Sequence, residues 1–167
     1  MKIRIAAAAA ALAGLAIAGS AVAAPAQAAP NAPAVVQQGT LSADAALKVA
    51  QAVQQEAAKQ KQRVTVAIID RTGATRLIVK GDGAGPQTEE SAKRKAFTAV
   101  SFGQPTSALA KNQALAAIPG TLLLAGGVPV ASGGAPIAGI GVGGAPSGDI
   151  DEAIANAGLK AISGQLR

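Results

Sequence analysis

The segment 126–148 constrains the fold more than any other part of the chain. Nine of its twenty-three residues are glycine, yet the apolar runs at 128–130 and 137–142 are typical of strands rather than of a linker. In the second run aliphatic residues alternate with glycines: Gly139, Ile140, Gly141, Val142 and Gly143. Because successive side chains of a strand point to opposite faces, one face of this strand is bare. Either another backbone or a flat ligand must lie against that face.

Large side chains are scarce elsewhere too, because the 167 residues include only two Phe and no Tyr, Trp, Cys or His. The core must therefore be built from closely packed Ala, Val, Ile and Leu, without disulfides. The same absences exclude a Ser-His-Asp triad, a thiolate nucleophile, a Cys/His zinc site and an iron–sulfur cluster. A net charge of +6 with so few aromatic residues also argues against nucleic-acid binding.

Residues 1–28 predict a secretory signal peptide. Lys2 and Arg4 precede an apolar run at 5–17, which is shorter than the roughly 20 residues of a membrane span. An A-x-A motif at 26–28 predicts cleavage before Ala29, which leaves a mature chain of net charge +4 without methionine. We expect a secreted or periplasmic protein with a flexible tail at 29–40 and a single domain at 41–167.

Periodicity along the mature chain predicts an α/β (α+β) domain. Ser42 is a suitable N-cap for the first helix, and residues 70–73 form the turn of a hairpin. Apolar spacing predicts helices from Ser42 to about Lys59 and at 88–102, 106–112 and 148–162, with strand-like segments at 64–69, 77–80, 122–124, 128–130 and 137–142.

A literal G-x-G-x-x-G occurs at 139–144, but its context does not fit a dinucleotide site. That fingerprint needs a second strand and an acidic residue about 20 positions further on. Here one helix remains before the chain ends, and no acid follows Glu152. We therefore exclude nucleotide binding at these glycines.

Four polar residues of the second predicted helix are candidates for binding an anionic apolar ligand. We expect Lys93 and Arg94 to extend into solvent, whereas Lys95 and Thr98 lie in the Ala-, Phe- and Val-rich part of the helix. On the last helix, Asp149 and Glu152 are three residues apart and share a face. Such a carboxylate pair either holds a cation or interacts with the helix dipole.

Taken together, six motifs resemble the GlcG/HbpS family of heme-binding proteins. They are VTVAIID at 64–70 with Gly73, KAFTA at 95–99, FGQPT at 102–106, IPG at 118–120, GGVPV at 126–130 and GIGVGGA at 139–145. The resemblance covers residues 41–162. It implies a profilin-like fold with an antiparallel sheet of about five strands flanked by helices, assembly into homo-oligomers such as octamers, heme as cofactor and, in some members, a membrane sensor as partner.

The chain departs from this family in one respect, because the mature sequence has none of the common axial ligands of heme iron. We expect heme to be held by apolar burial, with Arg94 or Lys95 pairing with its propionates and water, Thr98 or Thr106 at the iron. Gly139 and Gly141 would offer a flat face, and Asp149 with Glu152 would be the candidate iron site.

Two other functions remain open at this stage. One is an oligomeric sensor-partner or assembly protein of the same fold that has lost heme binding. The other is an enzyme acting on heme or on a small metabolite, with Lys95 and either Asp70 or Glu152 as acid and base.

Overall fold

The computed structural model describes residues 34–166, so the predicted signal peptide lies outside the described residues. The elements follow the order α1 (Ala43–Lys59), β1 (Thr65–Asp70), β2 (Thr75–Lys80), α2 (Thr88–Phe102), α3 (Thr106–Leu109), the 3₁₀ helix η1 (Gln113–Ala117), β3 (Gly127–Ser132), β4 (Ala135–Gly143), α4 (Gly148–Ile162) and the 3₁₀ helix η2 (Ser163–Gln165). Residues 34–40 are exposed and form neither helix nor strand.

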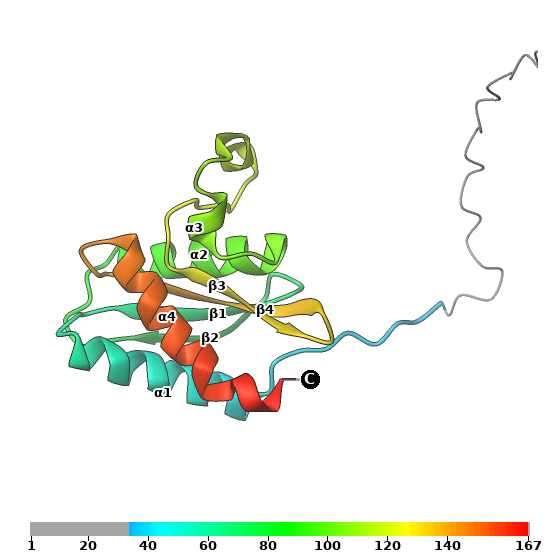
Figure 1. Cartoon of the computed structure of the whole chain (residues 1–167), viewed down its shortest axis with the longest axis horizontal. Helices are drawn as coiled ribbons and strands as arrows, with labels where there is room; N and C mark the ends of the chain where they lie inside the picture. The colour runs from blue at the N-terminus through cyan, green and yellow to red at the C-terminus, as the bar shows by residue number, and fades with distance from the viewer. Residues whose placement is uncertain (1–33, 167) are drawn as a thin grey trace, which may run out of the picture. The chain divides into compact units, whose positions relative to one another are not determined.

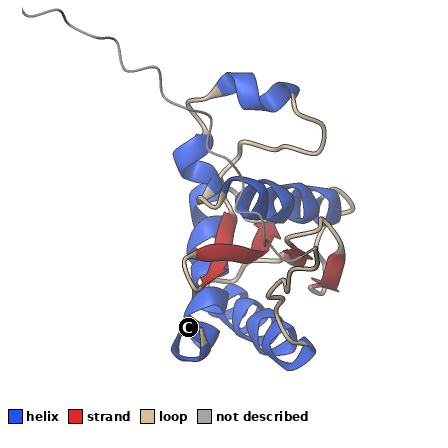
Figure 2. Cartoon of the chain, turned by 90° about the vertical axis from the view of Figure 1, so that its right-hand side faces the viewer, coloured by secondary structure: helices blue, strands red, loops and turns tan. Residues whose placement is uncertain are grey.

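The four strands form one antiparallel sheet in the order β2-β1-β4-β3. Two hairpins, β1–β2 and β3–β4, are joined through the central β1–β4 pair, in which Val66 is opposite Val142 and Ile68 is opposite Ile140. Figure 1 shows α2 on one face of this sheet and α1 with α4 on the other. Figure 2 shows the same three layers from the side.

The larger part of the core lies between the sheet and the α1–α4 layer. Alternate residues of β1 and β4, including Ile68 and Ile140, pack there against the apolar face of α1. That helix begins as predicted, because the Ser42 hydroxyl accepts a hydrogen bond from the Ala45 N–H at 3.2 Å.

The bare face of β4 is covered by α2. A Cβ placed on Gly139 would overlap the carbonyl oxygen of Ala96, and one on Gly141 would overlap that of Ala92. Of the two occupants left open by the sequence, the structure therefore shows a backbone. Glycine is required here because the helix lies closer to the sheet than any side chain on β4 would allow.

The predicted fold class is confirmed, but the predicted count of about five strands is corrected to four within residues 34–166. Residues 122–124 form no strand, although their run of leucines is apolar. Side chains of α2 bind this backbone instead of a neighbouring strand: Thr98 Oγ1 accepts the Leu122 N–H at 2.8 Å, and Arg94 donates to the Thr121 carbonyl at 2.6 Å. Hydropathy alone does not distinguish such a segment from a strand.

Residues 106–125 form an arm between α2 and β3, drawn at the top of Figure 2. The helix predicted at 106–112 ends earlier, at Leu109, and η1 follows it with no buried residue. Ile118 and Leu124 of the arm are 45% and 61% exposed. Among residues 34–166, none of the helices is long and apolar enough to cross a membrane.

Candidate functional site: two hollows beside helix α2

Helix α2 carries most of the predicted site residues, and its own ends are well defined. Gly103 ends the helix in the left-handed conformation. The Arg71 guanidinium donates to the last carbonyls of the helix, 2.5 Å from Val100 O and 3.1 Å from Ser101 O. A hollow lies on each flank of this helix, and we call them the Lys95 cleft and the Phe97 hollow.

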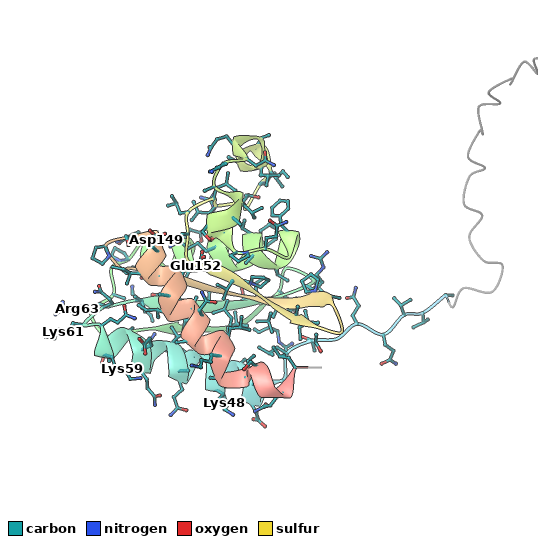
Figure 3. The ribbon with its side chains drawn as sticks, viewed as in Figure 1. Lys48, Lys59, Lys61, Arg63, Asp149 and Glu152 are labelled. Atoms are coloured by element: carbon teal, nitrogen blue, oxygen red, sulfur yellow. The ribbon has the colours of Figure 1, made fainter. Side chains whose placement is uncertain are left out.

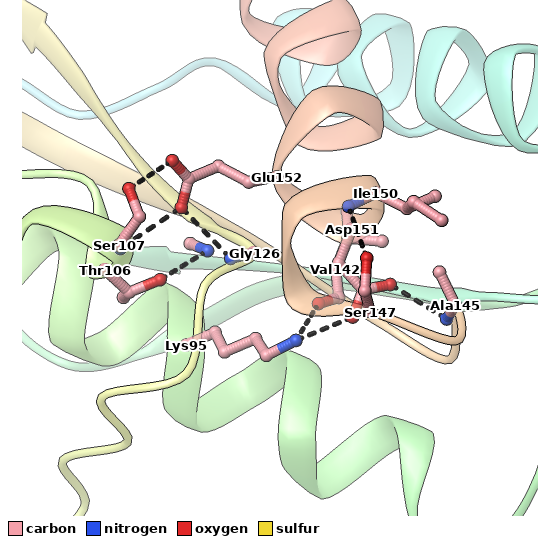
Figure 4. A network of polar contacts seen from close by, with 11 residues as sticks. Lys95, Thr106, Ser107, Gly126, Val142, Ala145, Ser147, Ile150, Asp151 and Glu152 are labelled. Atoms are coloured by element: carbon pink, nitrogen blue, oxygen red, sulfur yellow. Dashed lines mark hydrogen bonds and ion pairs between the residues drawn. The ribbon is translucent and has the colours of Figure 1, made fainter. Parts of the chain in front are cut away.

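Lys95 forms a buried ion pair with Asp151 of α4. Its Nζ lies 2.7 Å from Asp151 Oδ2 and 3.0 Å from the Val142 carbonyl of β4, and the side chains of the pair are only 3% and 4% exposed. Asp151 Oδ1 accepts the Ala145 N–H at 3.0 Å. Figure 4 shows the resulting network, in which one pair connects α2, β4, α4 and the loop before α4.

Burial raises the pKa of Asp151, and the hydrogen bonds from Lys95 and Ala145 oppose that rise. Sequence reasoning missed this residue in favour of its neighbours Asp149 and Glu152. Its burial could be predicted from helical spacing, because Asp151 lies on the same face of α4 as the other buried residues of that helix: Ile154, Ala155, Gly158 and Ile162.

The Lys95 cleft has a volume of about 380 Å³. Gln87, Thr88 and Ser91 line it from the start of α2, Leu124 and Ala125 from the arm, and residues 144–149 from the loop and first turn of α4. Lys95 and Asp151 also line it, and their low exposure places them at its floor.

Glu152 binds Ser107 at the start of the arm and the backbone of Gly126 just after it. Its carboxylate accepts hydrogen bonds from the Ser107 hydroxyl and N–H at 2.5 and 3.2 Å and from the Gly126 N–H at 3.1 Å. Figure 3 places Asp149 beside it at the start of α4, where Asp149 is exposed. Within residues 34–166 no three groups from His, Cys, Asp and Glu gather as they would around a metal ion. The metal site expected at Asp149 and Glu152 stays a prediction.

The hydroxyls of Thr98 and Thr106 are fully buried and engaged with the backbone. Thr98 donates to the Arg94 carbonyl at 2.8 Å and accepts the Leu122 N–H, while Thr106 accepts the Gly127 N–H at 2.9 Å. Neither oxygen is accessible to a ligand as the chain is folded here.

The Phe97 hollow, of about 170 Å³, lies on the other flank of α2. The half-buried Phe97 ring lies close to two glycines: a Cβ would come within 3.6 Å of the ring at Gly73 and within 3.1 Å at Gly120. Both glycines have positive φ, which disfavours a side chain at either position. At Gly120 a Cβ would also crowd the ring, whereas at Gly73 it would make ordinary contact. Lys93 and Arg94 line the same hollow, and Lys93 pairs with Glu90 at 3.5 Å.

The structure therefore separates the residues that the sequence grouped. Lys95 lines one hollow and Arg94 the other, while Gly139 and Gly141 are buried under α2. Among the described residues, the carboxylate paired with Lys95 belongs to Asp151, not to Asp70 or Glu152. Lys93 and Arg94 are partly exposed, as expected, and Lys95 and Thr98 are buried in the apolar part of the helix.

Comparisons with known proteins find one matching family and several similar solved structures. The family described as "Haem degrading protein HbpS-like" matches residues 41–160. The crystal structure of HbpS shares 52% identity with a TM-score of 0.76, over 81% of this chain and 99% of that one. A doubly substituted HbpS of Streptomyces reticuli also shares 52% identity, with a TM-score of 0.75, over 83% of this chain and 98% of that one.

A PduOC–heme complex shares 24% identity with a TM-score of 0.68 over 74% of this chain and 96% of that one, a likeness that shows the fold alone. No curated protein sequence matches. The family match extends over most of the chain, and the identity to HbpS is high over nearly the full length of that protein. The resemblance seen in the motifs is thus confirmed, and the chain belongs to the HbpS-like family of heme-degrading proteins.

Proposed function

We propose that this chain is an exported heme-binding protein that holds heme in the Phe97 hollow without a side-chain ligand to the iron. Membership in the HbpS-like family supports heme as the ligand. The observation behind the proposed position is the half-buried Phe97 ring in a hollow bordered by Gly73 and Gly120, with Lys93 and Arg94 beside it.

The residues of the hollow fit the periphery of heme. Phe97 and Ile69 offer an apolar surface to the porphyrin plane, and aromatic rings stack favourably on flat π systems. Lys93 and Arg94 outnumber Glu90 in the lining, so the hollow carries a net positive charge that favours the propionates of heme. Burial of a large apolar plane contributes roughly 25 cal/mol per Å² and supports binding without a bond to iron.

The iron itself finds no strong protein ligand in the described part of the chain, residues 34–166. This part contains no His, Cys, Tyr or Met, the hydroxyls of Thr98 and Thr106 are engaged, and the Lys95 ammonium is paired with Asp151. Heme bound here would therefore receive no bond from a protein side chain to its iron. Heme, when bound, supplies a redox-active iron centre, and the protein's residues hold its edges and exclude water from one face.

A second copy of the chain would complete the hollow. A volume of about 170 Å³ is small beside the roughly 300–1,000 Å³ of sites that enclose a ligand. Gly120 of the arm lines the hollow, and the adjacent Ile118 is exposed. No charged residue occurs between 112 and 148, so this segment adds no like-charge repulsion to a contact between two copies. We propose a closed homo-oligomer that covers heme at this contact.

Absorbance titration with hemin tests the assignment on the mature protein. We expect saturable binding that Phe97→Ala weakens at least tenfold, while Phe102→Ala, which removes the other aromatic ring, leaves it nearly unchanged. Lys93→Glu should weaken binding more than Lys48→Glu, which introduces the same charge change on α1. Equal effects within either matched pair would contradict the position, and an unchanged free-hemin spectrum would contradict heme binding.

Export is the second part of the proposal. Residues 1–28 have the composition of a signal peptide, and the proposed location is secreted or periplasmic. N-terminal sequencing of the exported protein should begin at Ala29. Recovery of the uncleaved chain in the cytoplasm alone would contradict it.

A second candidate is a sensor partner or assembly protein that has lost heme binding. It is favoured by one observation, namely that Lys95, Thr98 and Thr106 are all engaged within the fold. An oligomer that leaves the hemin spectrum unchanged would support this candidate over the first.

A further inference from the structure

We propose that the Lys95 cleft is a second binding site, separate from heme, for a small monocarboxylate whose oxygen accepts a hydrogen bond from Lys95. The cleft and the Phe97 hollow lie on different flanks of α2 and share no lining residue. The cleft also has more than twice the volume of the hollow. No role in the heme proposal uses it.

The ammonium group of Lys95 has an unused donor. An ammonium carries three N–H donors, and within residues 34–166 Lys95 uses two of them, toward Asp151 Oδ2 and the Val142 carbonyl. Because Lys95 lines the cleft, a ligand oxygen that enters the cleft can accept the third donor. A Cβ on Gly126 would come within 2.7 Å of Nζ and 2.8 Å of the Asp151 Cβ, so only glycine fits this close to the ion pair.

The polar groups above this floor are also available. The side chains of Gln87 and Ser91 line the cleft and make no hydrogen bond to any described residue. They can donate to or accept from a bound molecule in addition to Lys95. A cavity with several convergent polar groups and a charged residue at its floor has the composition of a small-molecule site.

The charges around the cleft favour a single negative charge. The N-terminal ends of α2 and α4 both border it, and each contributes partial positive charge. Asp151 neutralises Lys95, and the exposed Asp149 at the rim repels multiply charged anions. A monocarboxylate satisfies the donor on Lys95 with the least repulsion from Asp149.

Amide shifts in nitrogen-15 NMR spectra of the heme-free mature protein provide the test. Sodium acetate, sodium phosphate and sodium chloride are titrated separately at matched ionic strength and pH 7. We expect saturable acetate-dependent shifts confined to residues 87–91, 124–126 and 144–149. Phosphate, of which about half is a dianion at this pH, should bind more weakly. Absence of saturable acetate shifts in these segments, or equal shifts with chloride, would overturn the proposal.

Opposite charges introduced at Leu124 give a matched pair of variants. This side chain is exposed at the cleft, and its substitution does not disturb the core. Leu124→Lys should tighten acetate binding and Leu124→Asp should weaken it, each by about two- to fivefold, as expected for one charge at a hydrated site. Affinity that is the same in both variants would overturn the site.

The double variant Lys95→Met/Asp151→Leu removes both charges of the floor while keeping it filled. It should abolish the acetate shifts, and their persistence in a folded double variant would overturn the role of Lys95. Phe97→Ala should retain acetate binding even though it weakens heme binding. Failure of heme binding and failure of the carboxylate site are therefore distinguishable.

Discussion

Glycines on β4 determine how closely α2 approaches the sheet. Gly139 and Gly141 face the carbonyl groups of Ala96 and Ala92, and a Cβ at either position would overlap backbone that cannot rotate away. Overpacking of this kind is relieved only by moving the helix. These residues thus act on packing and, through the placement of α2, on both hollows.

Gly141→Ala should lower the free energy of unfolding by about 3 kcal/mol or more, because the methyl group forces α2 away from the sheet. Gly164→Ala is the matched control, since a Cβ there meets nothing within 4 Å. Urea denaturation of the two variants measures the difference. Equal midpoints for both variants would contradict the packing described for β4.

Asp70 stabilises the β1–β2 turn as a carboxylate. Its Oδ1 accepts the Thr72 hydroxyl at 2.6 Å, the Thr72 N–H at 2.9 Å and the Ala74 N–H at 3.1 Å. The hydrogen bond from the Thr72 hydroxyl is the main cause that lowers the pKa of Asp70 below 3.8, the usual value of an aspartate side chain.

Asp70→Ala should therefore cost about 1–3 kcal/mol of unfolding free energy at pH 7, the range for hydrogen bonds to a charged group. Because the folded pKa is the lower one, this contribution is complete above pH 3.8 and disappears as the pH falls through the folded value. Denaturation of wild type and variant from pH 6 to pH 2 measures it. A difference that grows toward low pH would show that the carboxylate is not the stabilising form.

Single residues were predicted from the sequence to different degrees. The burial of Lys95 and Thr98 followed from their apolar surroundings on the helix. Their partners did not, because Asp151 and Leu122 lie 56 and 24 positions away from them in the chain. Contacts over such separations depend on how helices and sheet pack, which periodicity within one element does not contain.

At the scale of elements, the first turn of α4 connects several neighbouring segments through two carboxylates. Asp151 holds Lys95 and the loop before α4, and Glu152 holds the start of α3 and the start of β3. The network in Figure 4 therefore fixes the walls of the Lys95 cleft.

Removing one partner of the buried Lys95–Asp151 pair should lower the free energy of unfolding more than removing both partners. Lys95→Met leaves Asp151 buried without its cation and should cost about 3–5 kcal/mol, whereas Lys95→Met/Asp151→Leu should recover a large part of that loss. Thermal or urea unfolding of the two variants compares them. A double variant less stable than the single one would contradict the picture of a desolvated pair.

The helices and the two hairpins could be predicted because caps, turns and periodicity are local signals, as at Ser42 and Gly73. The fifth strand could not be excluded in this way. Residues 122–124 have the apolar character of a strand, and only the tertiary contacts of Thr98 and Arg94 show that their backbone is bound by side chains.

At the scale of the whole molecule, the arm at residues 106–125 leaves apolar side chains uncovered. We expect the mature protein to be a closed oligomer in light scattering at ten micromolar. Ile118→Asp should shift it toward the monomer, because a charge would be buried in the contact. Leu47→Asp, a similarly exposed aliphatic position on α1, should not. A monomeric wild type would contradict the proposed assembly.

The central claim is that heme is held by its plane and its propionates while the iron has no side-chain ligand. Electron paramagnetic resonance of the ferric heme complex at pH 7 tests it most directly. His/Met and bis-His ligation would give low-spin iron, whereas water as axial ligand leaves it high-spin. We predict a dominant high-spin signal that differs from that of free hemin, and a dominant low-spin signal would contradict the account.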